Sequence, residues 1–115
     1  MRAIICYCRP TLAKEVTRLL REASLDVTVI RRDTGVMPSG EFVQVADGDT
    51  TLKMSIQWFG AANTPNELTS RIIVYVPRGW LDFFKGKDPC LQLGRKIRTI
   101  LEEHAIGGVQ FEDLT

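Results

Sequence analysis

Cys8 is the residue whose type and position best suit chemistry, because it ends an apolar run that begins at Ala3. Thr11 is a suitable helix N-cap, so Cys8 is expected at the carboxyl end of a central strand, just before a helix. Open α/β sheets bind ligands at such positions. Helix N-terminal amides and Arg9 would lower the pKa of the Cys8 thiol. Thiol chemistry is therefore one hypothesis, although cysteines in such runs more often fill a sheet face as small hydrophobic residues.

Metal and cofactor sites have little support in the sequence. The pair Cys6 and Cys8 lacks the two-residue gap of a zinc knuckle, and His104 is the single histidine. His104 falls on the apolar stripe of a predicted helix, and it could form a catalytic dyad only if Cys8 or Cys90 came within hydrogen-bond reach. We expect His104 at a stripe edge or helix cap, and we predict no metal and no cofactor.

Two short motifs resemble catalytic signatures, but the residues around them do not fit the catalytic structures. Cys90 and Arg95 are separated by one residue too few for a phosphate-binding loop, Lys96 stands where arginine would belong, and a helix is predicted there. The run Asp33-Thr34-Gly35 matches the signature of dimeric aspartic proteases. Arg31 and Arg32 separate it from the preceding apolar residues, so an ordinary turn is favoured. We therefore predict that the chain is not an enzyme.

An aromatic and basic segment from Gly79 to Lys87 is the predicted partner-binding surface, because tryptophan and arginine are favoured interface anchors. Its chosen residues, with the arginine that precedes it, are Arg78, Trp80, Phe83, Phe84, Lys85 and Lys87. The reserve surface is the solvated face of a predicted hairpin, with Lys53, Gln57 and Phe59.

Nucleic-acid binding is the first alternative, through Arg95, Lys96 and Arg98 on the exposed side of the last predicted helix. Arg98 and Glu102 are spaced to form an i,i+4 ion pair, which would satisfy one of these charges. The formal net charge of the chain is only +1, whereas a dedicated nucleic-acid binder usually carries a larger positive charge. A solvated basic face is therefore favoured over a nucleic-acid site.

Hydrophobic periodicity predicts the elements that must position these residues. Strand-like runs cover 3–8, 26–31, 41–46, 50–59 and 71–76, and a short edge strand is expected at 109–111. Helices are predicted from Thr11 and from Pro89, with apolar residues at helical spacing. The turn Asp47-Gly48-Asp49 indicates an antiparallel hairpin. The first strand, helix and second strand favour a right-handed parallel unit with the first strand in the middle of the sheet.

These elements predict an α+β fold, a single-domain two-layer sandwich over residues 1–115. It would have a mixed sheet of about five strands in β-α-β-β-β-β-α order, with a parallel first pair, an antiparallel hairpin and two helices on one face. The chain has 115 residues, 44% of them hydrophobic and 25% charged, which suits one compact core.

The functional expectation is a small cytosolic interaction module that docks onto a macromolecule in an adaptor, immunity or inhibitor type of role. A protein partner is favoured over nucleic acid, thiol chemistry at Cys8 is the second alternative, and homodimerisation is open. No signal peptide or membrane span is evident at the N-terminal end, and three cysteines fit a reducing compartment, so a cytoplasmic location is expected.

Overall fold

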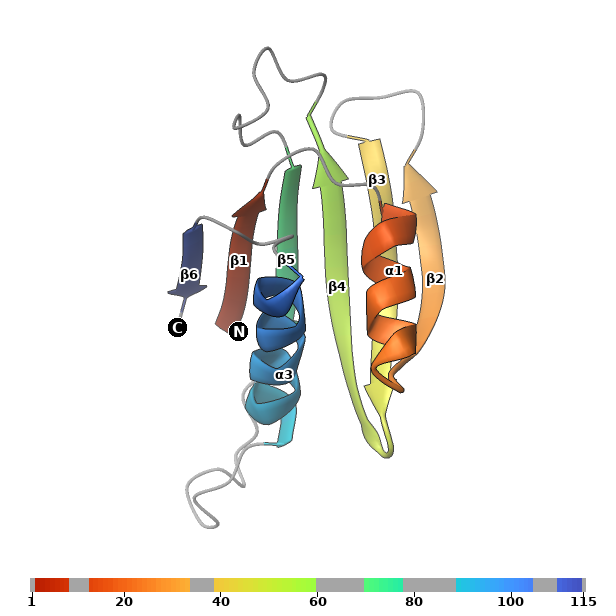
Figure 1. Cartoon of the computed structure of the whole chain (residues 1–115), viewed down its shortest axis with the longest axis vertical. Coiled ribbons are helices and arrows are strands. Elements are labelled where there is room, and N and C mark those ends of the chain that lie inside the picture. Colours follow the sequence, from red (N-terminus) through yellow and green to blue (C-terminus); the bar gives the residue numbers. More distant parts are fainter. Residues whose placement is uncertain are drawn as a thin grey trace.

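In a computed structural model, the structure describes residues 2–8, 13–33, 39–59, 70–77, 89–104 and 110–114, with residues 2, 8, 39 and 110–114 described by their backbone. Within these ranges lie six strands and two helices (Figure 1). Their bounds are β1 Arg2–Cys8, α1 Ala13–Glu22, β2 Asp26–Asp33, β3 Ser39–Asp47, β4 Thr50–Trp58, β5 Ser70–Val76, α3 Pro89–Glu103 and β6 Gln110–Leu114.

The strands form one sheet in the order β2-β3-β4-β5-β1-β6, and every neighbouring pair is antiparallel. The predicted parallel first pair is therefore wrong. The strands β1 and β2 are separated in the sheet by β3, β4 and β5, so the connection that contains α1 spans three strands, while α1 itself packs beside β2. The predicted place of β1 in the middle of the sheet is also wrong, because β1 lies beside the edge strand β6. That edge strand was expected at 109–111 and extends to Leu114.

The predicted hairpin is confirmed as β3 and β4, which pair from Ser39↔Trp58 to Asp47↔Thr50. Gly48 has φ 62°, and Asp49 is not among the positive-φ residues, which is the sign pattern of a type II′ turn. The strand β3 begins two residues earlier than predicted, since Ser39 and Gly40 already pair with β4. Local turn chemistry thus determined this part of the sheet.

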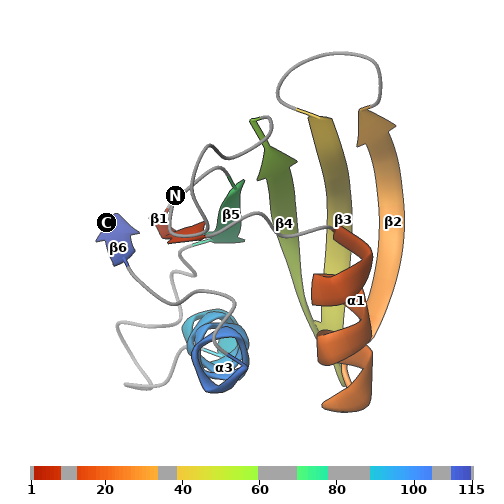
Figure 2. The same cartoon turned by 45° about the horizontal axis from the view of Figure 1, so that its top comes forward.

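Both helices lie on one face of the sheet, which confirms a two-layer α+β arrangement (Figures 1 and 2). Helix α1 packs beside β2, α3 packs on β4 and β5, and the two helices contact each other. Alternation along the strands sends every second side chain into this interface. The buried core is Ile4, Cys6, Val16, Leu19, Leu20, Leu25, Val27, Val43, Val45, Leu52, Met54, Ile56, Ile72, Val74, Val76, Leu93, Ile97, Ile100 and Leu101.

Helix α3 begins at Pro89, as predicted, and its apolar stripe enters the core. Gly94 allows α3 to approach the sheet closely, because an added Cβ would lie 3.0 Å from Val76 Cγ2 and 3.1 Å from Ile4 Cδ1. His104 was expected at the edge of this stripe or as a helix cap. It directly follows the last helical residue, Glu103, with its backbone N–H donating to Ile100 O at 3.3 Å, and it is exposed. No helix of the described ranges is long and apolar enough to cross a membrane.

Candidate functional site

The aromatic and basic segment chosen from the sequence lies outside the described residues, so it stays a prediction. This concerns Arg78, Trp80, Phe83, Phe84, Lys85 and Lys87. Cys8 is described by its backbone alone, at the end of β1 and opposite Ser70. Cys8 was chosen because ligands bind at the carboxyl ends of the central parallel strands of open α/β sheets. That reason does not hold, because β1 is not central and both of its neighbours, β5 and β6, are antiparallel to it.

The other cysteines and Asp33 occupy ordinary structural positions, while Thr34 and Gly35, the rest of the predicted turn, lie outside the described residues. Cys6 is buried in the core, and Cys90 lies in the first turn of α3, packed against the core. Because Cys90 lies in a helix, as predicted from the sequence, it cannot be part of a phosphate-binding loop. Asp33 is the last residue of β2, and its Oδ1 atom forms an ion pair with Arg31 Nε at 3.1 Å. Within the described residues, no group of three or more His, Cys, Asp or Glu side chains is arranged to hold a metal ion.

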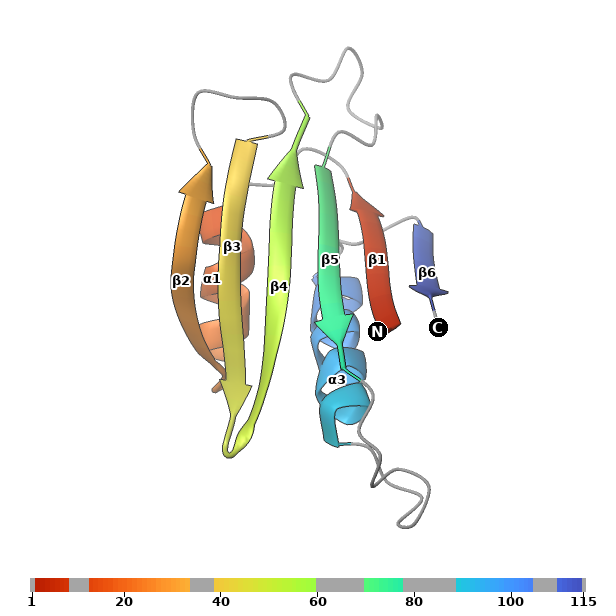
Figure 3. The same ribbon diagram turned by 180° about the vertical axis from the view of Figure 1, so that it is seen from behind.

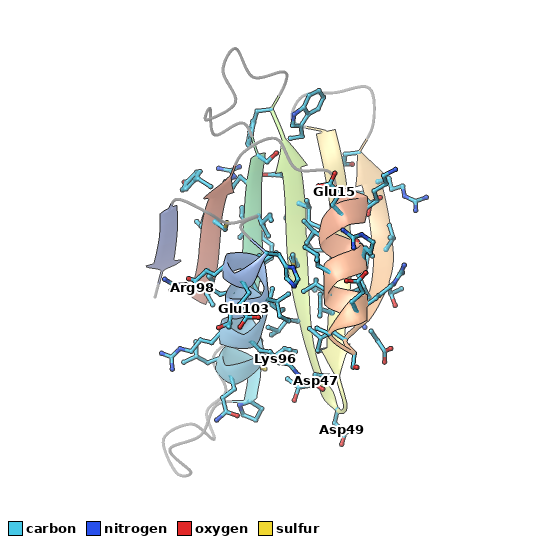
Figure 4. All side chains as sticks on the ribbon, viewed as in Figure 1. Glu15, Asp47, Asp49, Lys96, Arg98 and Glu103 are labelled. Carbon is cyan, nitrogen blue, oxygen red and sulfur yellow. The ribbon has the colours of Figure 1, made fainter. Side chains whose placement is uncertain are left out.

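The basic residues of α3 lie among acidic ones. Lys96 Nζ lies 3.2 Å from Asp47 Oδ2 in the β3–β4 turn region, which links the helix to the hairpin (Figure 4). Arg98 Nε lies 3.0 Å from Glu102 Oε1, the i,i+4 pair expected from the sequence. Arg95 is exposed. A surface of mixed charge is the usual solvated side of a helix, which gives the nucleic-acid alternative little support here.

The most distinctive surface is the side of the sheet opposite the helices, which we call the open face. Figure 3 shows that neither helix of the described chain covers it. Strand alternation places on its centre Ala3, Ile5, Tyr7, Phe42, Gln44, Lys53, Ser55, Gln57, Arg71, Ile73 and Tyr75. Most of these side chains are half-buried by their neighbours, Ser55 is buried and Lys53 is exposed. The centre therefore combines apolar and aromatic side chains with polar ones, namely Gln44, Lys53, Ser55, Gln57 and Arg71.

Arg71 is held in a fixed position on this face. Its Nε and Nη2 atoms both donate to Gln57 Oε1, at 2.9 and 2.7 Å, across the β4–β5 pair. Its guanidinium carbon also lies 5.1 Å from the ring centroid of Phe59, a side chain that is 45% exposed. Guanidinium groups are attracted to the faces of aromatic rings. An arginine restrained by two hydrogen bonds loses less conformational entropy when it binds a partner.

A second aromatic and cationic group lies across the sheet from the first. The rings of Phe42 and Tyr75 meet edge to face with centroids 6.2 Å apart. The guanidinium carbon of Arg31 lies 5.8 Å from the Phe42 centroid. Because Phe42 is on β3 and Tyr75 on β5, their contact passes over β4, where the small Ser55 and the long Lys53 are neighbours. The contact thus needs Ser55 to be small.

A hollow of about 250 Å³ lies beside Tyr75, between Gln44, Lys53 and Pro77. Pockets that accept one anchoring side chain of a partner are common at the energetic centre of protein interfaces. The hollow, the two aromatic groups and their cations make the open face the best candidate site among the described residues.

Sequence reasoning found part of this face and missed the rest. Lys53, Gln57 and Phe59 were the reserve surface, and the clean alternation of β4 identified them. Tyr7, Phe42 and Tyr75 were missed, the two tyrosines because runs as apolar as β1 and β5 are typical of strands covered on both faces. The signal that could have found them is that both runs carry tyrosine, a residue with a polar end, on the same side of adjacent strands.

No family model matches this chain, and comparisons with curated proteins and with solved structures also find no match.

Proposed function

We propose that the protein is a small interaction module that docks onto a protein partner through the open face, in an adaptor, immunity or inhibitor type of role. The observation that carries the proposal is Arg71, fixed by Gln57 and stacked on the exposed ring of Phe59. Arginine and aromatic residues are enriched at the centres of protein interfaces, and restrained side chains lower the entropy cost of docking.

The charges on this face indicate the chemistry of the partner. The strands β4 and β5 contain two charged residues, Lys53 and Arg71, and both are cations on the open face. The acidic residues of β3, Glu41 and Asp47, point to the helix side, where they pair with Arg32 and Lys96. The carboxylates on the open face itself, Asp26 and Asp33, lie on the edge strand β2, away from β4 and β5, and Asp33 pairs with Arg31. A complementary partner therefore presents an apolar side chain for the hollow beside Tyr75 and carboxylates for Lys53 and Arg71.

Affinity capture with charge-reversed variants tests this surface. The tagged protein and its Lys53→Glu and Arg71→Glu variants are incubated with lysate of the source cells after nuclease treatment, and bound proteins are quantified by mass spectrometry. We expect one stoichiometric partner on the original protein and at least about tenfold less of it on each variant, because reversed charges repel a complementary acidic surface.

The matched control is Arg95→Glu, which makes the same change of charge at an exposed position on α3. It should capture the partner at the original level. Equal capture by all variants would show that the open face is not the interface and would return attention to Trp80 and Phe84. Material that disappears with nuclease would instead favour nucleic-acid binding.

A further inference from the structure

A groove of about 460 Å³ lies between α1 and the strands β2 and β3, on the helix side of the sheet. We call it the α1 groove. Its size is within the usual range for small-molecule sites, about 300–1,000 Å³. It is on the opposite side of the sheet from the open face, so it is independent of the docking surface proposed above.

The helix contributes a polar stripe to the groove. Lys14, Thr17, Arg18 and Arg21 line it from α1 at positions i, i+3, i+4 and i+7, a spacing that places all four on one side of a helix. The core-facing side of α1 carries Val16, Leu19 and Leu20, and the buried Thr17 lies where this side meets the groove. The stripe therefore presents three cations and a hydroxyl to the neighbouring strands.

The sheet contributes Arg32 through a β-bulge. In a regular strand, Arg31 would follow Val27 and Val29 on the helix side. The register shift between Val29 and Arg31 instead places Arg32 there, opposite Glu41, while Arg31 lies opposite Phe42. Bulges frequently redirect side chains beside functional sites.

The formal charge of the groove is positive. Four cations line it against two carboxylates, Glu22 and Glu41. Arg18 Nη1 lies 2.9 Å from Glu22 Oε1, and Arg32 Nε lies 3.0 Å from Glu41 Oε1. Both arginines are well exposed, so water screens these pairs and an incoming anion can exchange with them. The surplus is two positive charges.

Two of the cations keep donors free for a ligand. Arg21 Nη2 donates to the carbonyl oxygen of Val27 at 2.9 Å, which uses one of its five N–H groups. The side chain of Lys14 makes no ion pair or hydrogen bond within the described part of the chain. These donors lie on the same helix side as Arg18.

Thr17 supplies the observation that a solvated basic surface does not explain. Its side chain is 6% exposed and lines the groove, and its Oγ1 atom has no hydrogen-bond partner among the described residues. A buried hydroxyl without a partner destabilises the fold. Because the Oγ1 atom has almost no exposed surface, a rotation of the Thr17 side chain about its Cα–Cβ bond would bring the hydroxyl into the groove, where a ligand oxygen would give it a partner.

We propose that the α1 groove binds a small molecule that carries a doubly charged phosphate monoester. Two negative charges match the surplus of the groove, and phosphate oxygens accept the charged hydrogen bonds that arginine and lysine donate. Thr17 donates to the same group. The half-buried Val29 provides an apolar wall for the organic part of the ligand.

NMR titration of the backbone amides of the ¹⁵N-labelled protein tests this proposal. The probes are inorganic phosphate and phenyl phosphate, with sodium chloride as the control at a constant ionic strength of about 0.15 M. We expect saturable shifts for phenyl phosphate at millimolar concentrations or below, confined to residues 13–22 and to the bulge of β2. Chloride should produce no saturable shift.

Three variants separate a built site from a merely basic surface. Lys14→Ala and Arg32→Ala should each weaken phenyl phosphate binding about tenfold, because each removes a charged donor. Thr17→Val keeps the shape of the side chain and should weaken binding about threefold or more. Arg95→Ala removes an exposed cation from α3 and should leave the affinity unchanged.

The proposal is overturned if neither phosphate probe gives saturable shifts up to about 10 mM. It is also overturned if the shifts spread equally over the cations of α3, or if Thr17→Val and Arg32→Ala bind phenyl phosphate as the original protein does. Because Thr17→Val removes an unpaired buried hydroxyl, it should fold at least as stably as the original chain, so loss of binding would not reflect unfolding.

Discussion

Ser24 occupies the left-handed backbone region, φ 66°, where α1 ends. The Leu25 N–H donates to the carbonyl of Leu20 at 3.1 Å, and the Ser24 N–H donates to that of Arg21 at 3.0 Å. This pair of bonds is a Schellman motif, and the left-handed position in it is usually glycine. The motif directs the chain from α1 into β2. It places Ser24 in the left-handed conformation, which is unfavourable for a residue with a Cβ.

Replacing this one residue tests the description of the helix end. Ser24→Gly should raise the free energy of unfolding by about 0.5–1 kcal/mol, because the left-handed conformation costs glycine little. In thermal unfolding followed by circular dichroism, this corresponds to an increase in Tm of roughly 2–5 °C. Ser24→Ala is the control and should not stabilise the chain. A lower Tm for Ser24→Gly would contradict the assignment.

At the scale of elements, the hairpin β3–β4 depends on Gly40. A Cβ at this position would meet the backbone carbonyl oxygen of Ile56 well inside van der Waals contact. Because backbone atoms cannot rotate away as a side chain can, relief requires the two strands to separate. The strands concerned present Phe42, Lys53 and Gln57, so the geometry of the open face depends on this close approach.

Gly40→Ala should therefore lower the free energy of unfolding by at least about 2 kcal/mol in urea denaturation. Gly48→Ala is a matched change in the same hairpin, with nothing within 4 Å of the added Cβ and φ 62°. It should cost only about 1 kcal/mol, from the left-handed backbone alone. Equal costs for the two variants would indicate that β3 and β4 do not approach each other as described.

What the sequence predicted depends on how far apart the interacting residues lie in the chain. Asp47-Gly48-Asp49 predicted the hairpin because a tight turn and its strands are neighbours in sequence. The apolar spacing of Val16 and Leu20 in one helix, and of Leu93 and Ile97 in the other, likewise predicted both helices and their buried sides. Local pattern was sufficient for these elements.

The strand order could not be predicted in the same way. A strand, helix and strand in succession normally form a parallel pair, and that rule led to the wrong neighbours for β1. Pairing of β1 with β5 joins residues about 70 positions apart, Cys8 and Ser70 being only one end of the ladder. The bulge that turns Arg32 toward α1 is a further feature that periodicity does not encode, so the α1 groove was not predicted.

At the scale of the whole molecule, the sheet separates two surfaces with different chemistry. The helix side carries the α1 groove, with its surplus of positive charge around a buried hydroxyl. The open face carries aromatic rings with restrained cations and the hollow beside Tyr75. Because the two surfaces lie on opposite faces of one sheet, a partner on the open face leaves the α1 groove accessible.

Site-specific photo-crosslinking in cell lysate tests whether the protein docks through the open face. A photoreactive phenylalanine analogue is placed at Lys53 on the open face, at Gln92 on α3 or at Trp80, and each protein is irradiated in lysate of the source cells. Lys53 and Gln92 are both exposed, so they differ in surface and not in access. We predict one crosslinked protein adduct from position 53 and none from position 92. An adduct from position 80 or 92 without one from position 53 would show that a different surface binds the partner.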